Sequence, residues 1–196
     1  NDILAELYPI VGNRPHVRDA PVFLCFCADL TRMEYAIAER GGSMDNNPLE
    51  IGLVASIDAS LLGMSAYLTA ESLGLRGLMI GAVRNNPTKV AEILNLPRRV
   101  YVVFGMVLGW PAEAPLQKPR MDQGMTVHFD QYGNQKDARD LGDQLGTYDE
   151  QLSGHYNSIG KDTTRDSWTN DIHAKFANPS RMDLRDKLKE RGFDFL

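Results

Sequence analysis

The sequence lacks the short motifs that identify several large enzyme classes. It contains no G-x-S-x-G segment, no phosphate-binding P-loop and no G-x-G-x-x-G segment. Its four histidines are scattered, and no cluster of cysteines lies near any of them: His16, His128, His155 and His173. These absences argue against a triad hydrolase, a P-loop NTPase, a classical Rossmann dehydrogenase and a bound metal.

Cysteines and clustered basic residues are also scarce. Cys25 and Cys27 stand two residues apart in an apolar run, too close to pair comfortably within a strand. We therefore expect two reduced core residues in a cytoplasmic protein. The formal net charge is -5 and no block of lysine or arginine occurs, which argues against nucleic acid as a partner.

The most apolar stretch, residues 47–81, predicts a long helix followed by a strand. From Ile51 to Leu73 only Asp58 and Glu71 are charged, which favours a helix that is buried all round. Asn47 suits the N-cap of this helix and Gly74 suits its C-terminal cap. Small residues recur at helical spacing and predict close packing against a second long helix or a partner subunit: Ala55, Ala59, Gly63, Ala66 and Ala70.

The same stretch raises the alternative of a membrane span, because residues 51–68 are almost free of charge. However, Asp58 lies near the middle, many of the residues are small, and no basic segment flanks the stretch. We therefore expect a helix of the protein core and no membrane partner.

The other elements follow from apolar runs and helical periodicity. Apolar runs of strand length occupy residues 21–28, 77–83 and 100–110. Helical patterns occupy residues 2–9, 30–40, 87–94, 147–158, 167–176 and 181–191. Three strands separated by helices indicate an α/β or α+β layer structure, and connections of this length permit parallel pairing.

Two short segments have residues suited to a phosphate or a flat ligand. Gly81 stands at the end of a predicted buried strand, followed by Arg84, a cation that we expect to be exposed, and glycine permits close approach to the backbone. Lys118 and Arg120 flank a proline, so that both cations can converge on one phosphate. Taken alone, each segment also has a simpler interpretation. The first can be a strand end followed by a turn, and the second can be a solvent-exposed loop.

Three longer segments carry a resemblance to a known family: ESLGLRGLMIGAVRNN, LPRRVYVVFGMVLGWPAEAPLQKPR and TRDSWTNDIHAKFANPSR. They resemble the flavin-dependent nitroreductase family, in its NADPH-linked branch of oxygen-insensitive nitroreductases and flavin reductases. The resemblance runs in order from about Leu7 to Phe193. Its most specific parts are FGMVLGWP, KPR and the Trp-Thr-Asn-Asp run.

The resemblance implies an α+β fold with a mixed central sheet flanked by helices. It also implies an intertwined homodimer with a long central helix, and FMN bound at the subunit interface. Residues 1–196 then form a single nitroreductase domain, in which 147–196 is a C-terminal extension that embraces the other subunit. The family's opening His-Arg-Ser-x-Arg-x-Phe-like motif and its later Gln-x-Tyr-Ser strand are not in this sequence, so we expect an N-terminal FMN-binding segment to be missing here.

The resemblance also assigns residues to ligands. Lys118 and Arg120 would bind the FMN phosphate, and the strand end would lie against the isoalloxazine ring through Met79, Ile80, Gly81 and Ala82. Arg181 would contact the substrate or the nicotinamide nucleotide. Lys161 would take the place of a basic residue that binds the 2′-phosphate of NADPH, which favours NADPH over NADH.

The activity implied is that of an FMN-dependent NAD(P)H oxidoreductase, which reduces nitroaromatics, quinones or free flavin by ping-pong hydride transfer. Such an enzyme needs no catalytic side chain, because the flavin carries the chemistry. The alternative is a non-catalytic or flavin-less relative whose cofactor site is incomplete.

Overall fold

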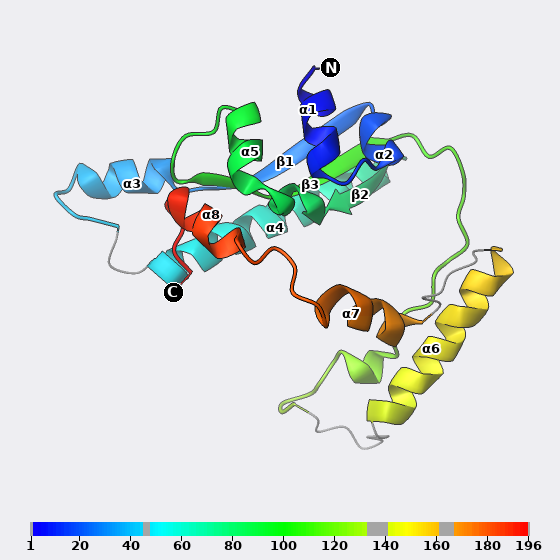
Figure 1. Ribbon diagram of the computed structural model, residues 1–196. Coiled ribbons are helices and arrows are strands. Elements are labelled where there is room, and N and C mark those ends of the chain that lie inside the picture. Colours follow the sequence, from blue (N-terminus) through cyan, green and yellow to red (C-terminus); the bar gives the residue numbers. More distant parts are fainter. Residues whose placement is uncertain (1, 45–47, 133–140, 161–166, 196) are drawn as a thin grey trace. The chain divides into compact units, whose positions relative to one another are not determined.

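The computed structural model describes residues 2–44, 48–132, 141–160 and 167–195. They form two compact units (Figure 1). The first runs to Ala112 and includes the chain again from Arg181 onward, and the second is Glu113–Ser180.

The first unit is built on a three-stranded sheet. Its strands are β1 (Val22–Asp29), β2 (Arg76–Ile80) and β3 (Val100–Gly109), in the order β1-β3-β2. Both pairings are antiparallel, and a bulge shifts the β1–β3 register at Phe26/Cys27. The expected α+β class is confirmed. The resemblance, however, implied a mixed sheet. Among the described residues both strand pairings are antiparallel, because β3 lies between β1 and β2 and runs antiparallel to each.

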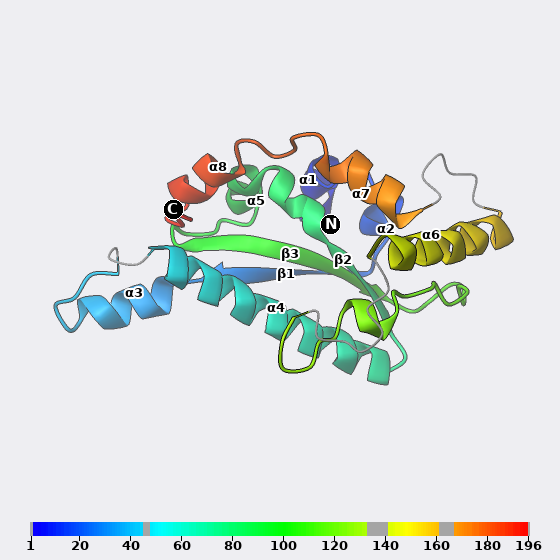
Figure 2. The same ribbon diagram turned by 90° about the horizontal axis from the view of Figure 1, so that it is seen from below.

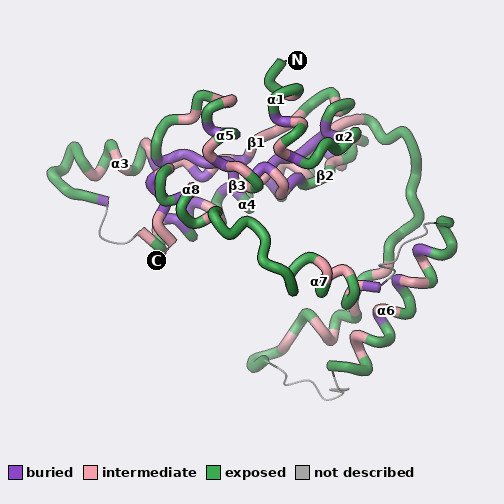
Figure 3. Tube along the Cα trace, in the orientation of Figure 1, coloured by how far each residue is buried: buried purple, intermediate pink, exposed green. Residues whose placement is uncertain are grey.

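Helices cover both faces of this sheet (Figure 2). One face carries α4 (Pro48–Ser72). The other carries α1 (Asp2–Ile10), α2 (Pro15–Arg18), the 3-10 helix η1 (Gly81–Asn85) and α5 (Pro87–Ile93), with a core that includes Leu7, Val11, Val83 and Val90. Two further helices, α3 (Thr31–Ala38) and α8 (Leu184–Glu190), complete this unit. The buried residues concentrate along the sheet (Figure 3).

The small residues of α4 pack against the sheet of the same chain. Gly52, Ala55, Ala59, Gly63 and Ala70 are the buried residues of this helix. A side chain at Gly63 would overlap the Phe104 ring of β3, so glycine sets how closely helix and sheet approach. The prediction that this ridge packs against another helix or a partner subunit is therefore wrong. The expected N-cap, Asn47, lies outside the described residues.

The opposite face of α4 is exposed, although the sequence predicted burial all round. Large apolar side chains on it stand 44–64% exposed, among them Leu53, Ile57, Leu61, Leu62 and Leu68. By length and composition α4 could cross a membrane, with a mean hydropathy of 1.5 over a window of which 22% is buried. One such helix is weak evidence for a membrane span, because core helices of soluble proteins pass the same test.

The second unit contains η2 (Gln123–Met125), α6 (Leu141–Ser158) and α7 (Trp168–Phe176). Its core joins Tyr148, Leu152 and Tyr156 of α6 to Met121 and Trp168. The Asp149 carboxylate accepts the backbone N–H and the hydroxyl of Thr169, which ties α6 to α7. Helix α6 begins at Leu141, six residues before the predicted start at residue 147.

Candidate functional site

The end of β2 places the segment Met79–Ala82. Strand β2 ends at Ile80, which is paired with Gly105 of β3, and the chain then turns into η1. The strand therefore ends three residues earlier than predicted. Ile80 is buried, Gly81 and Ala82 are half-buried, and Met79 is 40% exposed. This segment offers a partly open backbone without a large side chain at Gly81.

Arg84 fills the space behind Gly81. A Cβ atom at Gly81 would lie 3.3 Å from Nη2 of Arg84, and Nη1 of Arg84 donates to the Val103 carbonyl of β3. The sequence predicted an exposed cation here, but Arg84 is half-buried because η1 packs along the edge of β3. Burial lowers the pKa of Arg84, and the positive charge of Arg181 lowers it further.

Arg181 lies beside the same 3-10 helix. Its Nε donates to Oδ1 of Asn85 at 2.8 Å, and Nδ2 of Asn85 donates to the Ile10 carbonyl at 3.0 Å. Asn85 thus joins three segments that are far apart in the sequence. The structure brings Arg181 to Asn85, three residues after the segment Met79–Ala82. It also adds Arg84 and Asn85, whose roles depend on contacts between distant segments and could not be read from local sequence.

Lys118 and Arg120 belong to the second compact unit and are both exposed. Nζ of Lys118 lies 5.3 Å from the centre of the Tyr156 ring, and Nη1 of Arg120 donates to the Lys118 carbonyl at 3.0 Å. Among the described residues neither cation forms an ion pair with a carboxylate. Two uncompensated cations two residues apart suit a phosphate dianion. Lys161 lies outside the described residues.

Gly105 of β3 lies against an aromatic side chain of β1. A side chain there would meet the Phe23 ring, with Cε1 at 2.7 Å, so the glycine makes room for an aromatic residue of the neighbouring strand. The bulge lies nearby, between Phe26 and Cys27 on β1.

Two cavities in the first unit lie away from this site. One of about 370 Å³ is lined by β1, α3 and α4 residues, including Cys27, Asp29 and Asp58. The other, of about 400 Å³, is lined by residues that include His16, Leu78 and Trp110. Gly81, Arg84 and Arg181 line neither of these cavities. The candidate site is therefore identified from the chemistry of its residues and not from a pocket.

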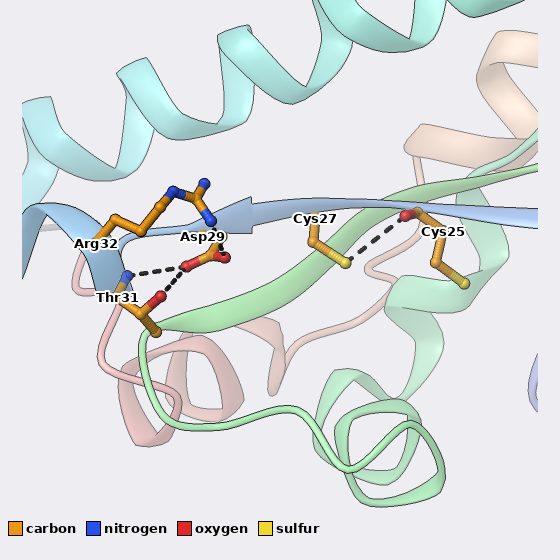
Figure 4. A network of polar contacts seen from close by, with 5 residues as sticks. All are labelled: Cys25, Cys27, Asp29, Thr31 and Arg32. Atoms are coloured by element: carbon orange, nitrogen blue, oxygen red, sulfur yellow. Dashed lines mark hydrogen bonds and ion pairs between the residues drawn. The ribbon is translucent and has the colours of Figure 1, made fainter.

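The polar network beside the first cavity stabilises the fold (Figure 4). Oδ1 of Asp29 accepts the backbone N–H of Thr31 at 2.9 Å and its hydroxyl at 2.6 Å, while Oδ2 pairs with Arg32 at 3.0 Å. Burial tends to raise the pKa of Asp29, but these donors outweigh it and hold that pKa below the ordinary value. The carboxylate therefore fixes the turn into α3.

Burial raises the pKa of Cys25 to about 12, and it also raises the pKa of Cys27. Both cysteines are free thiols in the structure, and both are half-buried rather than fully buried as the prediction of core residues required. No group of three His, Cys, Asp or Glu residues that could hold a metal ion occurs in the described part of the chain.

Comparison with known proteins gives matches along almost the whole chain. The model of the nitroreductase family matches residues 9–110, and that of the nitroreductase family C-terminal domain matches residues 118–196. An oxygen-insensitive NADPH nitroreductase of Salmonella typhimurium is 36% identical over 188 residues, which are 95% of this chain and 74% of that protein. An FMN reductase [NAD(P)H] of Bacillus subtilis is 37% identical over 192 residues, 96% of this chain and 75% of that protein.

A solved structure agrees in fold. The hypothetical oxidoreductase YcnD from Bacillus subtilis superposes with a TM-score of 0.90 at 35% identity, covering 98% of this chain and 77% of that one.

Proposed function

The chain belongs to the nitroreductase family, and from this we propose that it is an FMN-dependent NAD(P)H oxidoreductase that reduces nitroaromatics, quinones or free flavin. The observation that carries the proposal is the similarity, over at least 95% of this chain, to proteins named NADPH nitroreductase and FMN reductase. The flavin-less alternative finds no support in these relatives.

The chemistry of the described residues fits FMN. Lys118 and Arg120 are exposed cations that form no ion pair with a described carboxylate, so they can neutralise a phosphate without breaking an existing pair. The segment Met79–Ala82 presents half-buried backbone at Gly81, where a flat ring can approach closely. Within its own unit, Lys118 and Arg120 are thus proposed as phosphate ligands, and within the other unit Met79–Ala82 is proposed as a contact of a flavin ring.

When bound, FMN supplies the relay that takes a hydride from the nicotinamide and delivers it to the acceptor. The residues of this chain bind and orient the reactants. Arg181 is held by Asn85, so its guanidinium can donate to a polar group of the donor or of the acceptor in turn. Donor and acceptor use the same space in succession, which gives ping-pong kinetics. The preference for NADPH through Lys161 stays a prediction.

We also propose that two copies pair through the exposed face of α4. Several large apolar side chains of α4 are exposed, and contiguous exposed apolar patches mark interaction surfaces. A second copy would bury Leu53, Ile57, Leu61 and Leu68 and keep α4 out of water.

Two half-buried thiols without a disulfide agree with a cytoplasmic protein.

The dimer can be tested by light scattering after size exclusion. Leu61→Glu places a charge on the exposed apolar face, so the variant should elute with the mass of a single chain. Tyr132→Glu, at a side chain that is 91% exposed and outside α4, is the matched control and should stay dimeric. A Leu61→Glu variant with the mass of two chains would contradict the assignment of this face.

The activity can be tested by steady-state NADPH oxidation with a quinone as acceptor, with and without added FMN. We expect FMN-dependent oxidation and parallel lines in double-reciprocal plots at several quinone concentrations. A protein that oxidises neither NADPH nor NADH at saturating FMN is instead the flavin-less relative.

A further inference from the structure

One cavity of the first unit has no part in the proposed reaction. It has a volume of about 400 Å³ and lies at one end of the sheet, where residues 76–78 begin β2 and residues 107–109 end β3. The connection 19–21, which enters β1, and residues 110–112 complete its walls, together with His16. Pockets for small molecules measure roughly 300–1,000 Å³, so this cavity has room for a compact ligand.

Trp110 gives the cavity an uncovered aromatic wall. It is 74% exposed, although tryptophan is one of the more buried residue types on average. Leu78 of β2 lines the same cavity and is 50% exposed. A Cβ atom at Gly74 would lie 3.2 Å from Cζ3 of Trp110, so the turn after α4 supports the indole from one side. An exposed and supported indole offers a surface on which a flat ring can stack.

The charge available in this cavity is positive. The guanidinium of Arg76 has five N–H groups, and its Nη1 donates to the Leu75 carbonyl at 3.0 Å. Oε1 of Glu71 lies 3.9 Å from the same nitrogen, too far for a hydrogen bond. Asp19, which also lines the cavity, already accepts Nε and Nη2 of Arg18 at 2.6 and 2.9 Å. The remaining N–H groups of Arg76 therefore suit an anion that brings its own acceptors.

We propose that this cavity binds a small aromatic carboxylate, with the ring stacked on Trp110 and the carboxylate on the guanidinium of Arg76. The ligand class follows from the two features together, since the wall selects a flat apolar ring and the cation selects a negative group. The exposed pair of Arg76 with Glu71 is no obstacle, because ion pairs of this kind contribute little and are easily exchanged.

This binding does not depend on the proposed oxidoreductase function. Gly81, Arg84 and Arg181 do not line the cavity, and neither Trp110 nor Arg76 has a role in the proposed reaction. The ligand should therefore bind while flavin and nicotinamide nucleotide are present.

The test is a calorimetric titration at saturating FMN and NADP+ with 4-iodobenzoate and with 4-iodobenzamide, which matches it in shape and is neutral. The benzoate should bind roughly tenfold more tightly, because it gains a charge-assisted contact. Arg76→Met should remove that difference, whereas Trp110→Leu should weaken both ligands several-fold. Arg98→Met, which removes an exposed arginine two residues before β3 begins, is the matched control and should bind like the wild type.

A second readout locates the ligand. The sequence has two tryptophans, so Trp168→Phe leaves Trp110 as the only source of indole emission. Iodine quenches indole emission on contact, and 4-iodobenzoate should therefore quench this variant saturably, with the Kd that calorimetry gives.

Two results would overturn the proposal. One is a benzoate that binds no more tightly than the amide, or a preference for benzoate that survives Arg76→Met. The other is a benzoate that binds only when FMN and NADP+ are left out, because the ligand would then occupy the flavin or nicotinamide site. Binding that follows Arg76 and Trp110 in a protein that oxidises no NADPH would uphold this site and contradict the oxidoreductase function alone.

Discussion

Replacing Lys118 and Arg120 together with alanine should remove tight FMN binding and leave the fold intact. Both side chains are exposed, and each makes only local contacts: Lys118 with the Tyr156 ring and Arg120 with backbone carbonyls. Losing an exposed cation–π contact costs about 0.5–1 kcal/mol in stability. The double variant should therefore unfold within a few degrees of the wild type.

The loss in FMN affinity should be much larger than the loss in stability. A hydrogen bond between a cation and a phosphate contributes about 1.5–3 kcal/mol, and two give about 3–6 kcal/mol. Because both side chains are exposed and screened by salt, we expect the lower end, about 3 kcal/mol, or a Kd raised roughly 100-fold.

The assay is a titration of FMN fluorescence with wild type and variant at low salt. Lys187→Ala with Lys189→Ala is the matched control, since these cations are also two residues apart but are paired with Asp183 at 2.6 Å and Asp194 at 3.0 Å. The control should bind FMN like the wild type. If Lys118→Ala with Arg120→Ala retains stoichiometric flavin with an unchanged Kd, the phosphate assignment is refuted.

Three further predictions concern the fold. Gly63→Ala should lower the free energy of unfolding by about 1–3 kcal/mol, because the added methyl group would overlap the Phe104 ring. Gly154→Ala, on the open face of α6, is the control and should be neutral or stabilising. Urea unfolding measures both free energies. Asp29→Asn should cost about 1 kcal/mol near neutral pH. Because the folded pKa of Asp29 is lowered, its stabilisation is present above the unfolded pKa and fades as the pH falls through the folded value, so the difference should shrink below the ordinary value of 3.8 and vanish below the folded pKa. Cys25, with its pKa raised to about 12, should be alkylated by iodoacetamide far more slowly in the native protein than in urea, and equal rates would contradict its burial.

Much of the fold could be predicted from local patterns. The apolar runs located β1 and β3 to within a residue, because both strands are almost continuously apolar in sequence. Helix α4 was also predicted, and Gly74 ends it with φ +83 as expected of a C-terminal cap. The spacing of the small residues marked the buried face of α4, since Ala55, Ala59, Gly63 and Ala70 are buried, but it did not reveal that this face packs on the sheet of the same chain.

The candidate site could be predicted only in part. Gly81 and Arg181 were identified by resemblance, and the structure links Arg181 to Asn85, which stands four residues after Gly81 and 96 residues before Arg181. The half-burial of Arg84 depends on the edge of β3, which extends past the end of β2, and no local pattern reveals that. The roles of Lys118 and Arg120 remain predictions, since they lie in the other compact unit.

The central claim is that this chain carries a flavin that exchanges hydride with a nicotinamide nucleotide. The most direct measurement is the visible absorbance of the FMN-loaded protein before and after anaerobic addition of NADPH. We predict a stoichiometric flavin band that bleaches with NADPH and returns when a quinone is added. A protein that binds no FMN, or whose bound flavin is bleached by neither NADPH nor NADH, would contradict the account.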